Sequence, residues 1–118
     1  IIDDDKHMQA LVKLFLEQAG FDVTSAMDGM QGIMFARQRV PDLIILDYML
    51  PAGGGGTVFE RVRMMSTLSH IPILVFSAAN KEEIEKKIKF DARTVHLQKP
   101  MPPPAIVEKI KELLTPAA

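Results

Sequence analysis

The sequence predicts the α/β class, with a single parallel sheet covered by helices on both faces. Short apolar runs alternate with segments of helical spacing along the whole chain, as strand–helix units do. The runs at residues 43–46 and 73–76 are apolar without alternation, which is typical of strands buried on both faces. Each connection between such parallel strands should be right-handed. Because no linker, repeat or second core interrupts the pattern, we expect one domain over residues 1–118.

The first two strand–helix pairs are expected before Pro41. We expect strands at residues 1–2 and 21–25, and helices at residues 8–19 and 28–40. Gly20 is a natural stop for the first of these helices. Asp28 is the expected N-cap of the second, with Gln31 three residues later, and Pro41 ends it.

Three further pairs complete the predicted sheet. We expect strands at residues 43–46, 73–76 and 94–98, each followed by a helix. Thr57 and Glu60 form a capping box that predicts the start of the third helix, and Asn80 and Glu83 cap the fourth. The fifth helix begins among residues 102–104, all proline, because a missing amide N–H costs little in the first turn.

Composition and charge exclude several classes of function. With 118 residues, 47% apolar and 25% charged, the chain has enough material for a packed core. It has no cysteine, so disulfides, thiolate metal sites and a cysteine nucleophile are excluded. Its formal net charge of −1 provides no basic surface for nucleic acid or for an anionic membrane. No membrane span or signal peptide is visible, so we expect a cytoplasmic location, and because the chain opens on Ile1 we expect the native N-terminus to lie upstream.

Polar side chains follow the predicted strands at the point where each strand ends. Asp3 and Asp4 follow the first strand, Asp47 the third, Ser77 the fourth and Lys99 the fifth. In an open parallel sheet these carboxyl ends meet at one edge, which is where such folds bind ligands. Crowded carboxylates repel one another unless a cation offsets their charge, and an all-oxygen site that retains waters favours Mg²⁺ over Ca²⁺. We therefore predict a Mg²⁺ site at this edge.

Each of these residues also has an ordinary structural interpretation. An acidic triplet after a strand is typical of a helix N-cap, and we assign that role to Asp5. Ser77 alone is typical of a turn, and Lys99 alone of a solvated side chain. Asp47 is harder to explain in this way, because a helix cap has no need to follow four buried aliphatic residues. The functional interpretation depends on the joint placement of these residues at one edge of the sheet.

Together these motifs resemble the receiver domain of two-component response regulators, over essentially the whole chain. The resemblance lies in Asp3-Asp4, in Asp47 with Pro51 four residues later, in Ser77-Ala78 and in Lys99-Pro100. Each motif alone is weak, but four of them in this order and at the family's spacing are specific. The resemblance implies a flavodoxin-like (βα)5 fold, which is a doubly wound, five-stranded parallel sheet with strand order 2-1-3-4-5.

The resemblance also implies a function for Asp47. Receiver domains take a phosphoryl group from a phosphohistidine, so Asp47 is expected to be the phosphoacceptor, with a histidine kinase or a histidine phosphotransfer protein as partner. Such a domain is a signalling module that catalyses only its own phosphorylation and dephosphorylation. Phosphoryl transfer depends mostly on positioning and charge neutralisation, which agrees with the residues found at the strand ends.

Roles for the remaining site residues follow from the same resemblance. Mg²⁺ is expected to bind Asp4, Asp47 and the backbone carbonyl of Met49, with Asp3 acting through water. Lys99 is expected to pair with the phosphoryl oxygens.

A switch is implied at the fourth and fifth strands. The Ser77 hydroxyl is expected to donate a hydrogen bond to the phosphoryl group and to draw the following loop inward. His96 stands where the family usually has Tyr or Phe as the switch aromatic. The movement would reset the surface of the fourth helix, fifth strand and fifth helix toward an output domain, a downstream protein or a second copy in a phosphorylation-dependent dimer.

The sequence departs from the family pattern at several positions besides His96. Residues 53–56 are four consecutive glycines, where the family usually has one. No Lys-Ser/Thr follows them, so we reject a phosphate-binding P-loop and expect a mobile loop. Ala92-Arg93 replaces a pair of small residues, and Met101 replaces a common Phe. None of these changes affects the expected acceptor or metal ligands.

Three other functions compete with phosphoacceptor signalling. A pseudo-receiver, which is a protein-interaction module without phosphorylation, would not require the complete set of acids, hydroxyl and lysine. A flavin mononucleotide binder would need a Ser/Thr/Gly-rich loop after the first strand, where residues 3–5 would instead repel phosphate. A haloacid-dehalogenase-like phosphatase would need a second aspartate two residues after Asp47, and that residue is Met49.

Overall fold

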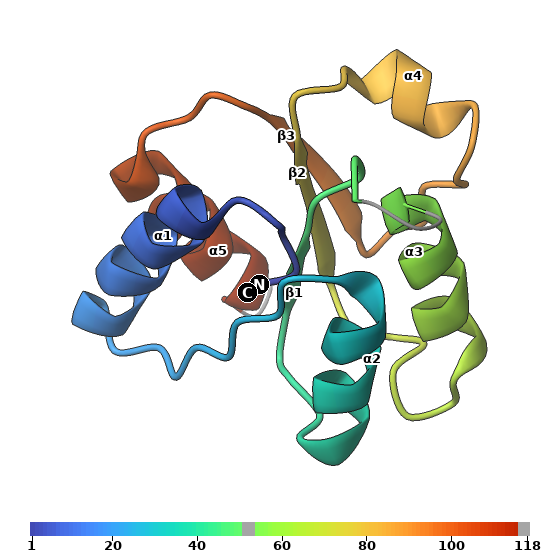
Figure 1. Ribbon diagram of the computed structural model, residues 1–118, viewed down its shortest axis with the longest axis horizontal. Coiled ribbons are helices and arrows are strands. Elements are labelled where there is room, and N and C mark those ends of the chain that lie inside the picture. The colour runs from blue at the N-terminus through green and yellow to red at the C-terminus, as the bar shows by residue number, and fades with distance from the viewer. Residues whose placement is uncertain (51–53, 116–118) are drawn as a thin grey trace.

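The computed structural model describes residues 1–50 and 54–115 and has the predicted α/β architecture (Figure 1). In chain order its elements are α1 (Lys6–Gln18), α2 (Gly29–Gln38), β1 (Ile44–Leu46), α3 (Gly54–Met64), β2 (Ile73–Ser77), α4 (Lys81–Glu85), β3 (Thr94–Gln98) and α5 (Pro103–Leu114). Within the described ranges, no helix combines the length and the apolar character needed to cross a bilayer.

β1, β2 and β3 form a parallel sheet in that order. Ile73 of β2 pairs with Ile44 of β1 on one side, and β3 pairs with β2 on the other. Ile2 extends the sheet beyond β1, because it makes one parallel bridge to Leu46 and a second to Ala26. Across the sheet the chain segments therefore follow the predicted order 2-1-3-4-5.

Two of the five expected strands do not form: the first is reduced to the two bridges of Ile2, and residues 21–25 form no strand, because the bridge on that side falls on Ala26, just beyond them. The backbone N–H of Ile2 donates to the carbonyl of Ile45, and its own carbonyl accepts from Asp47. Directly after Ile2 the chain leaves the sheet toward α1, so neither side has the consecutive pairs that make a strand. The last of these backbone hydrogen bonds comes from the N–H of Asp3, which donates to the carbonyl of Ala26 at 3.0 Å.

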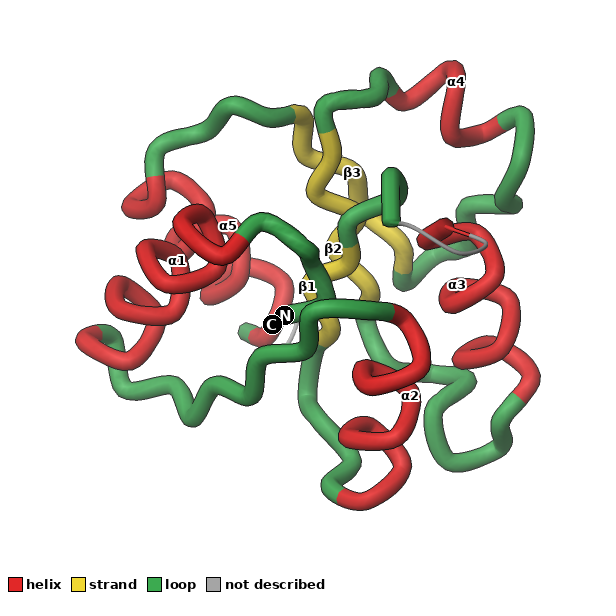
Figure 2. Tube along the Cα trace, in the orientation of Figure 1, coloured by secondary structure: helices red, strands yellow, loops and turns green. Residues whose placement is uncertain are grey.

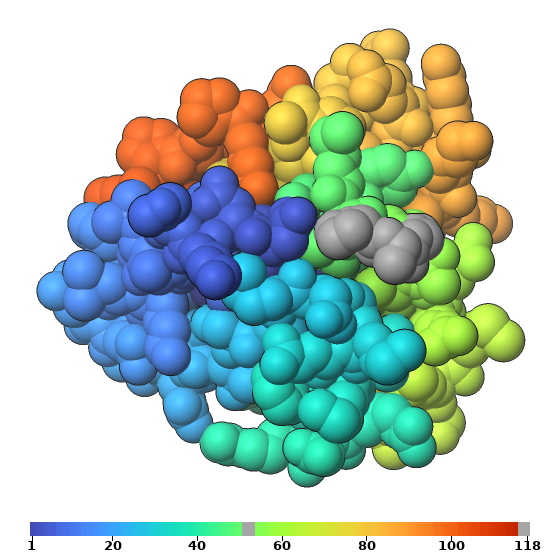
Figure 3. All heavy atoms as spheres, in the orientation of Figure 1, coloured from blue at the N-terminus to red at the C-terminus, as the bar shows by residue number. Residues whose placement is uncertain are grey.

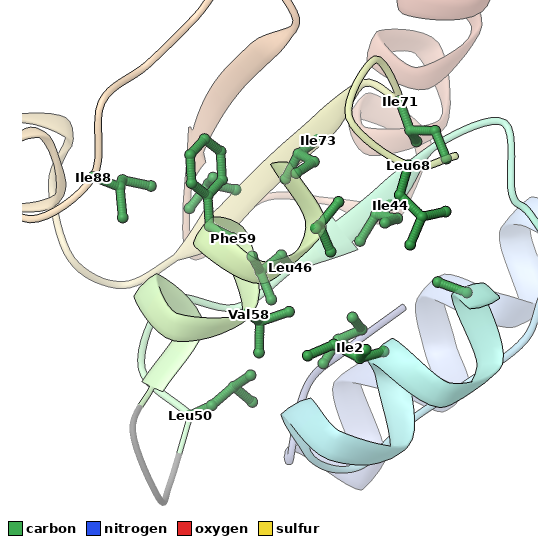
Figure 4. Packing of buried hydrophobic residues seen from close by; sticks show 14 of the residues in the cluster. Ile2, Ile44, Leu46, Leu50, Val58, Phe59, Leu68, Ile71, Ile73 and Ile88 are labelled. Carbon is green, nitrogen blue, oxygen red and sulfur yellow. The ribbon is translucent and has the colours of Figure 1, made fainter. Parts of the chain in front are cut away.

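Helices cover both faces of the sheet (Figures 1 and 2). α1 and α5 pack on one face, against the buried side chains of Ile45, Leu74 and Phe76. α2, α3 and α4 pack on the other face, against Leu46 and Val75, in the cluster shown in part in Figure 4. Successive strand residues point to opposite faces, and both faces are apolar, as the runs without alternation predict.

Three predicted helix starts are confirmed by side-chain caps. Asp5, Asp28 and Asn80 accept hydrogen bonds from the backbone amides three residues later, at 3.0, 2.8 and 2.9 Å. The first helix ends as predicted, with Gly20 at a φ of +97° that favours glycine. α4 ends at Glu85, although Ile88 beyond its end is still buried in the core.

The third helix begins earlier than the capping box predicts. α3 starts at Gly54, so Thr57 lies inside the helix and is not its N-cap. The backbone N–H of Gly55 donates to the carbonyl of Tyr48 at 2.7 Å, which holds the first turn against the segment that follows β1. The expectation of a mobile glycine loop is therefore wrong for residues 54–56, which form the first turn of α3. Gly53 lies outside the described residues.

At the amino ends of the strands, Arg63 joins α3 to the start of β3. Its guanidinium pairs with Asp91 at 2.7 Å and donates to the carbonyl of Ile71, also at 2.7 Å, and to the hydroxyl of Thr94 at 3.2 Å. Burial acts to raise the pKa of Asp91, but the hydrogen bonds from Arg63 and Thr94 outweigh it and lower that pKa below its ordinary value. We call these four residues the Arg63 cluster.

Candidate functional site

The carboxyl ends of the strands bring the predicted residues together. Asp3 follows the bridge residue Ile2, Asp47 follows β1, Ser77 is the last residue of β2, and Lys99 follows β3. Backbone hydrogen bonds hold these ends side by side, because Lys99 donates to Ser77 at 2.8 Å and Asp47 donates to Ile2 at 2.9 Å. In Figure 3 the dark blue, bright green and orange segments of the chain meet on one face of the molecule.

Three carboxylates form the centre of this edge. One oxygen from each of Asp3, Asp4 and Asp47 lies within 4.8 Å of the other two. Asp3 and Asp47 are buried, whereas Asp4 is exposed, so the cluster is accessible to solvent from one side. Oxygen donors with access for water are what Mg²⁺ prefers in proteins, and these residues therefore fit the predicted ion.

Lys99 places a positive charge beside two of the carboxylates. Its Nζ lies 2.8 Å from Oδ2 of Asp3, 3.5 Å from Oδ2 of Asp47 and 5.4 Å from the ring centre of Phe76. Burial disfavours the ammonium, but the hydrogen bond to Asp3 and the charges of both carboxylates outweigh it and raise the pKa of Lys99 above its ordinary 10.5. Burial raises the pKa of Asp3 above its ordinary 3.8, against the hydrogen bond from Lys99. Lys99 is therefore a fixed cation at neutral pH.

Local backbone amides hold the second oxygen of each buried carboxylate. Oδ1 of Asp3 accepts from the N–H of Asp5 at 2.9 Å, and Oδ1 of Asp47 accepts from the N–H of Met49 at 3.0 Å. Each carboxylate thus has one oxygen bound to its own loop and the other beside Lys99. The side chain of Met49 is 61% exposed, so this residue faces the site through its backbone.

Ser77 and His96 are linked through the loop that follows β2. The Ser77 hydroxyl is fully buried and accepts a hydrogen bond from the N–H of Ala79 at 3.3 Å. Nε2 of His96 lies 3.0 Å from the carbonyl oxygen of Ala79, which makes this ring nitrogen the donor. Gln98, two residues along β3, donates to the carbonyl of Ala78 at 3.2 Å. Two side chains of β3 therefore hold the loop that begins at Ser77.

The sequence patterns miss two residues that support the site. Gln9 of α1 is buried, and its amide donates to the backbone carbonyl of Asp3 at 2.7 Å. The available signal is its helical spacing from the buried Val12. Gly55 lies so close to Asp47 that a Cβ there would be 2.4 Å from the Asp47 carbonyl oxygen, and the available signal is the run of glycines.

An α/β fold with an acidic cluster and a lysine at the carboxyl edge of its sheet is typical of one class of signalling proteins. Comparison of the sequence with known families identifies the same class. The family model for the response regulator receiver domain matches residues 1–111. The chain belongs to this family, which confirms the resemblance found in the sequence. Receiver domains are signalling modules rather than classical enzymes. They bind Mg²⁺ at an acidic pocket and interact with histidine kinases and output domains.

Individual relatives support the assignment. The chain is 40% identical over 116 residues to the DNA-binding dual master transcriptional regulator RpaA of Synechocystis sp., a match that covers 97% of this chain and 47% of that protein. It is 31% identical over 115 residues to the alkaline phosphatase synthesis transcriptional regulatory protein PhoP of Bacillus subtilis, with the same coverage of each chain. The chain thus spans about half the length of these curated relatives. The structure of the chemotaxis response regulator CheY4 of Vibrio cholerae matches with a TM-score of 0.87 at 28% identity, over 96% of this chain and 94% of that one.

Proposed function

We propose that this receiver domain, taken as residues 1–118, is a phosphoacceptor of a two-component system and that Asp47 accepts the phosphoryl group. The observation that carries the proposal is the meeting of three carboxylates with the ammonium of Lys99 at one edge of the sheet. Carboxylates that repel one another beside a fixed cation are suited to bind a second cation and to neutralise a transferred phosphoryl group.

Asp47 is suited to act as the nucleophile because one of its oxygens is held and the other is free to react. Oδ1 accepts from the N–H of Met49, while Oδ2 lies 3.5 Å from Nζ of Lys99. In the transfer, Oδ2 forms a bond to phosphorus as the bond from phosphorus to the histidine nitrogen breaks, and that nitrogen keeps the electron pair. Lys99 then pairs with the phosphoryl oxygens.

The acidic cluster is proposed to hold Mg²⁺ through Asp4, Asp47 and the backbone carbonyl of Met49, with Asp3 acting through water. When bound, the ion supplies positive charge that offsets the charge of the acceptor and of the phosphoryl oxygens. Asp4 is the most accessible of these carboxylates, because it is exposed while Asp3 and Asp47 are buried.

Ser77 and His96 are proposed to form the switch. The Ser77 hydroxyl turns from the N–H of Ala79 to donate to a phosphoryl oxygen, and the loop moves with it. Because His96 donates to the carbonyl of Ala79, this movement breaks or displaces the bond to His96. The change then reaches the surface formed by α4, β3 and α5.

A phosphohistidine on a histidine kinase or a histidine phosphotransfer protein is the proposed phosphoryl donor, with the exchange taking place in the cytoplasm. The reset surface is proposed to act on an output domain, on a downstream protein or on a second copy in a phosphorylation-dependent dimer. We infer no direct nucleic-acid contact by this domain, because its formal net charge of −1 offers no excess of cations to phosphates.

Phosphorylation by acetyl phosphate tests the proposal. In the presence of Mg²⁺ the intact mass should increase by one phosphoryl group that is labile at alkaline pH, and chelation of the metal should prevent the increase. Asp47→Asn should abolish it, whereas the same substitution at the exposed Asp42 should not. An unchanged yield in Asp47→Asn would show that the acceptor is wrong. A wild-type protein that no phosphoryl donor modifies would instead be a protein-interaction module.

A further inference from the structure

Gln9 is a polar residue on the buried stripe of α1, where its neighbours are Val12 and Leu16. Its side chain is 97% removed from solvent, with a relative exposure of 3%. From this position it reaches the segment that carries Asp3 and Asp4. We propose that Gln9 is a positioning residue for the Mg²⁺ site, acting through the backbone of Asp3. This inference rests on the function proposed above.

The side-chain amide of Gln9 is bound to backbone carbonyls from two segments. Nε2 donates to Asp3 at 2.7 Å and to Ala26 at 2.6 Å, which uses both of its hydrogens, and a third carbonyl, that of Ile1, lies at 3.4 Å. The reverse orientation of the amide would place an oxygen against these three carbonyl oxygens. The contacts therefore determine which end of the amide faces the sheet.

The oxygen end of the Gln9 amide is energetically unfavourable. Oε1 of Gln9 is buried and has no hydrogen-bond partner in the described part of the chain. An unpaired buried acceptor is unfavourable, and an apolar side chain of similar length would fill the same space without it. The favourable contribution of glutamine at this position therefore comes from the hydrogen bonds that its Nε2 donates.

One of these hydrogen bonds is to the peptide group that joins Asp3 to Asp4. The carbonyl of Asp3 has Gln9 as its hydrogen-bond donor, and no other donor to it is found among the described residues. Fixing this peptide plane fixes the N–Cα bond of Asp4, and the hydrogen bond from the N–H of Asp5 to Oδ1 of Asp3 restrains the peptide that follows, so together they restrict the direction in which the Asp4 side chain leaves the backbone. Because Asp4 is exposed, packing does not hold its side chain, and the backbone sets the range of positions open to its carboxylate. Supporting contacts of this kind commonly change metal affinity although they do not touch the metal.

The test compares Gln9→Met with Val12→Ala in the full chain. Both residues are buried on α1, but the Gln9 side chain donates a hydrogen bond to the carbonyl of Asp3, which a valine side chain cannot do. Calorimetric titration with MgCl₂ should show that Gln9→Met weakens binding by roughly tenfold. Val12→Ala, which lowers stability through a cavity, should bind Mg²⁺ like the wild type. Equal affinities for Gln9→Met and the wild type, or an equal loss in both variants, would overturn the inference.

A metal-free measurement separates this inference from the proposed function. The N–H of Asp5 donates to Oδ1 of Asp3, so its hydrogen exchange reports on the order of the segment without any ion. Exchange at Asp5 should be faster in Gln9→Met than in Val12→Ala. If the wild type binds no Mg²⁺ but this difference is seen, the proposed metal site fails while the positioning of the segment by Gln9 stands. If the difference is absent, the inference fails whatever the wild type binds.

Discussion

The ammonium of Lys99 is hydrogen-bonded to Asp3, at 2.8 Å, and not to the proposed acceptor. Its distance to Oδ2 of Asp47 is longer, 3.5 Å. The buried Asp3 thus holds the cation in place, and the reactive oxygen of Asp47 is only partly neutralised. This arrangement leaves room at the acceptor for further positive charge, which agrees with the Mg²⁺ proposed to bind there.

Removing the cation should make the fold depend on Mg²⁺. In Lys99→Met, the buried Asp3 and Asp47 carboxylates face each other without compensation. The free energy of unfolding in EDTA should fall by about 2 kcal/mol, less than for a fully buried pair, because the ammonium is partly exposed. Adding MgCl₂ should then stabilise the variant more than the wild type in urea unfolding. Lys87→Met, at an exposed lysine, should change neither value, and an equal Mg²⁺ effect in all three proteins would contradict the account.

Within the acidic triplet, Asp4 should act as a ligand of Mg²⁺ and Asp5 as the N-cap of α1. Tyr48, the chain's single tyrosine, lies directly after Asp47, and there is no tryptophan, so its emission should report Mg²⁺ binding. Asp4→Ala should weaken binding strongly, because one carboxylate is a large share of an oxygen site that retains waters. Asp5→Ala should lower the free energy of unfolding by about 1 kcal/mol through loss of the N-cap, with little change in affinity. Equal weakening by both substitutions would show that the roles are assigned wrongly.

The site could be predicted from the sequence wherever it depends on strand order. Residues that follow parallel strands meet at one edge whatever the loops between them do, which is why Asp3, Asp47 and Lys99 are found together. The start of α3 could not be predicted, because it depends on how closely Gly55 approaches the backbone after β1. Gln9 is similar: its spacing marks it as buried, but its carbonyl partners come from segments that only the folded chain brings together.

His96 should restrain the loop that carries Ser77. His96→Phe keeps a ring but removes the hydrogen bond to the carbonyl of Ala79, so the free energy of unfolding should fall by about 1 kcal/mol. The released loop should move more readily, and beryllofluoride, which mimics the phosphoryl group, should shift the Ala79 amide resonance at a lower concentration. His96→Gln, which keeps a donor, should stay closer to the wild type. Identical midpoints of the beryllofluoride titration for His96→Phe and His96→Gln would show that His96 does not restrain the loop.

The Arg63 cluster should stabilise the fold in a pH-dependent way. The pKa of Asp91 is lowered in the folded state, so its contribution is fully present above the ordinary value of 3.8 and is lost as the pH falls below it. Asp91→Asn should therefore lower the free energy of unfolding by about 1 kcal/mol at pH 7, and the difference from the wild type should shrink as the pH falls below 3.8. Asp22→Asn breaks an exposed pair with Arg39 and should change little at either pH. A difference for Asp91→Asn that does not depend on pH would contradict the assignment.

Two adjacent glycines of α3 should respond in opposite ways to the same substitution. A Cβ on Gly55 would lie 2.4 Å from the carbonyl oxygen of Asp47 and 2.6 Å from Cα of Tyr48, and both are backbone atoms that have little freedom to move. A Cβ on Gly56 would meet only side-chain atoms of Ile88 and Tyr48, at 3.5 and 3.7 Å, which is ordinary contact. Gly55→Ala should therefore lower the free energy of unfolding by about 2 kcal/mol, as overpacking does. Gly56→Ala should raise it by roughly 0.5–1 kcal/mol, because alanine favours the helix.

The same pair of variants tests whether the start of α3 supports the acceptor. The Gly55 clash falls on the residue proposed to take the phosphoryl group, so Gly55→Ala should also slow phosphorylation by acetyl phosphate under conditions where the variant is fully folded. Gly56→Ala, which does not approach Asp47, should be phosphorylated at the wild-type rate. Urea unfolding and the time course of the intact mass measure the two effects separately. If Gly55→Ala is destabilised but phosphorylated normally, the close approach of α3 serves packing alone and does not position Asp47.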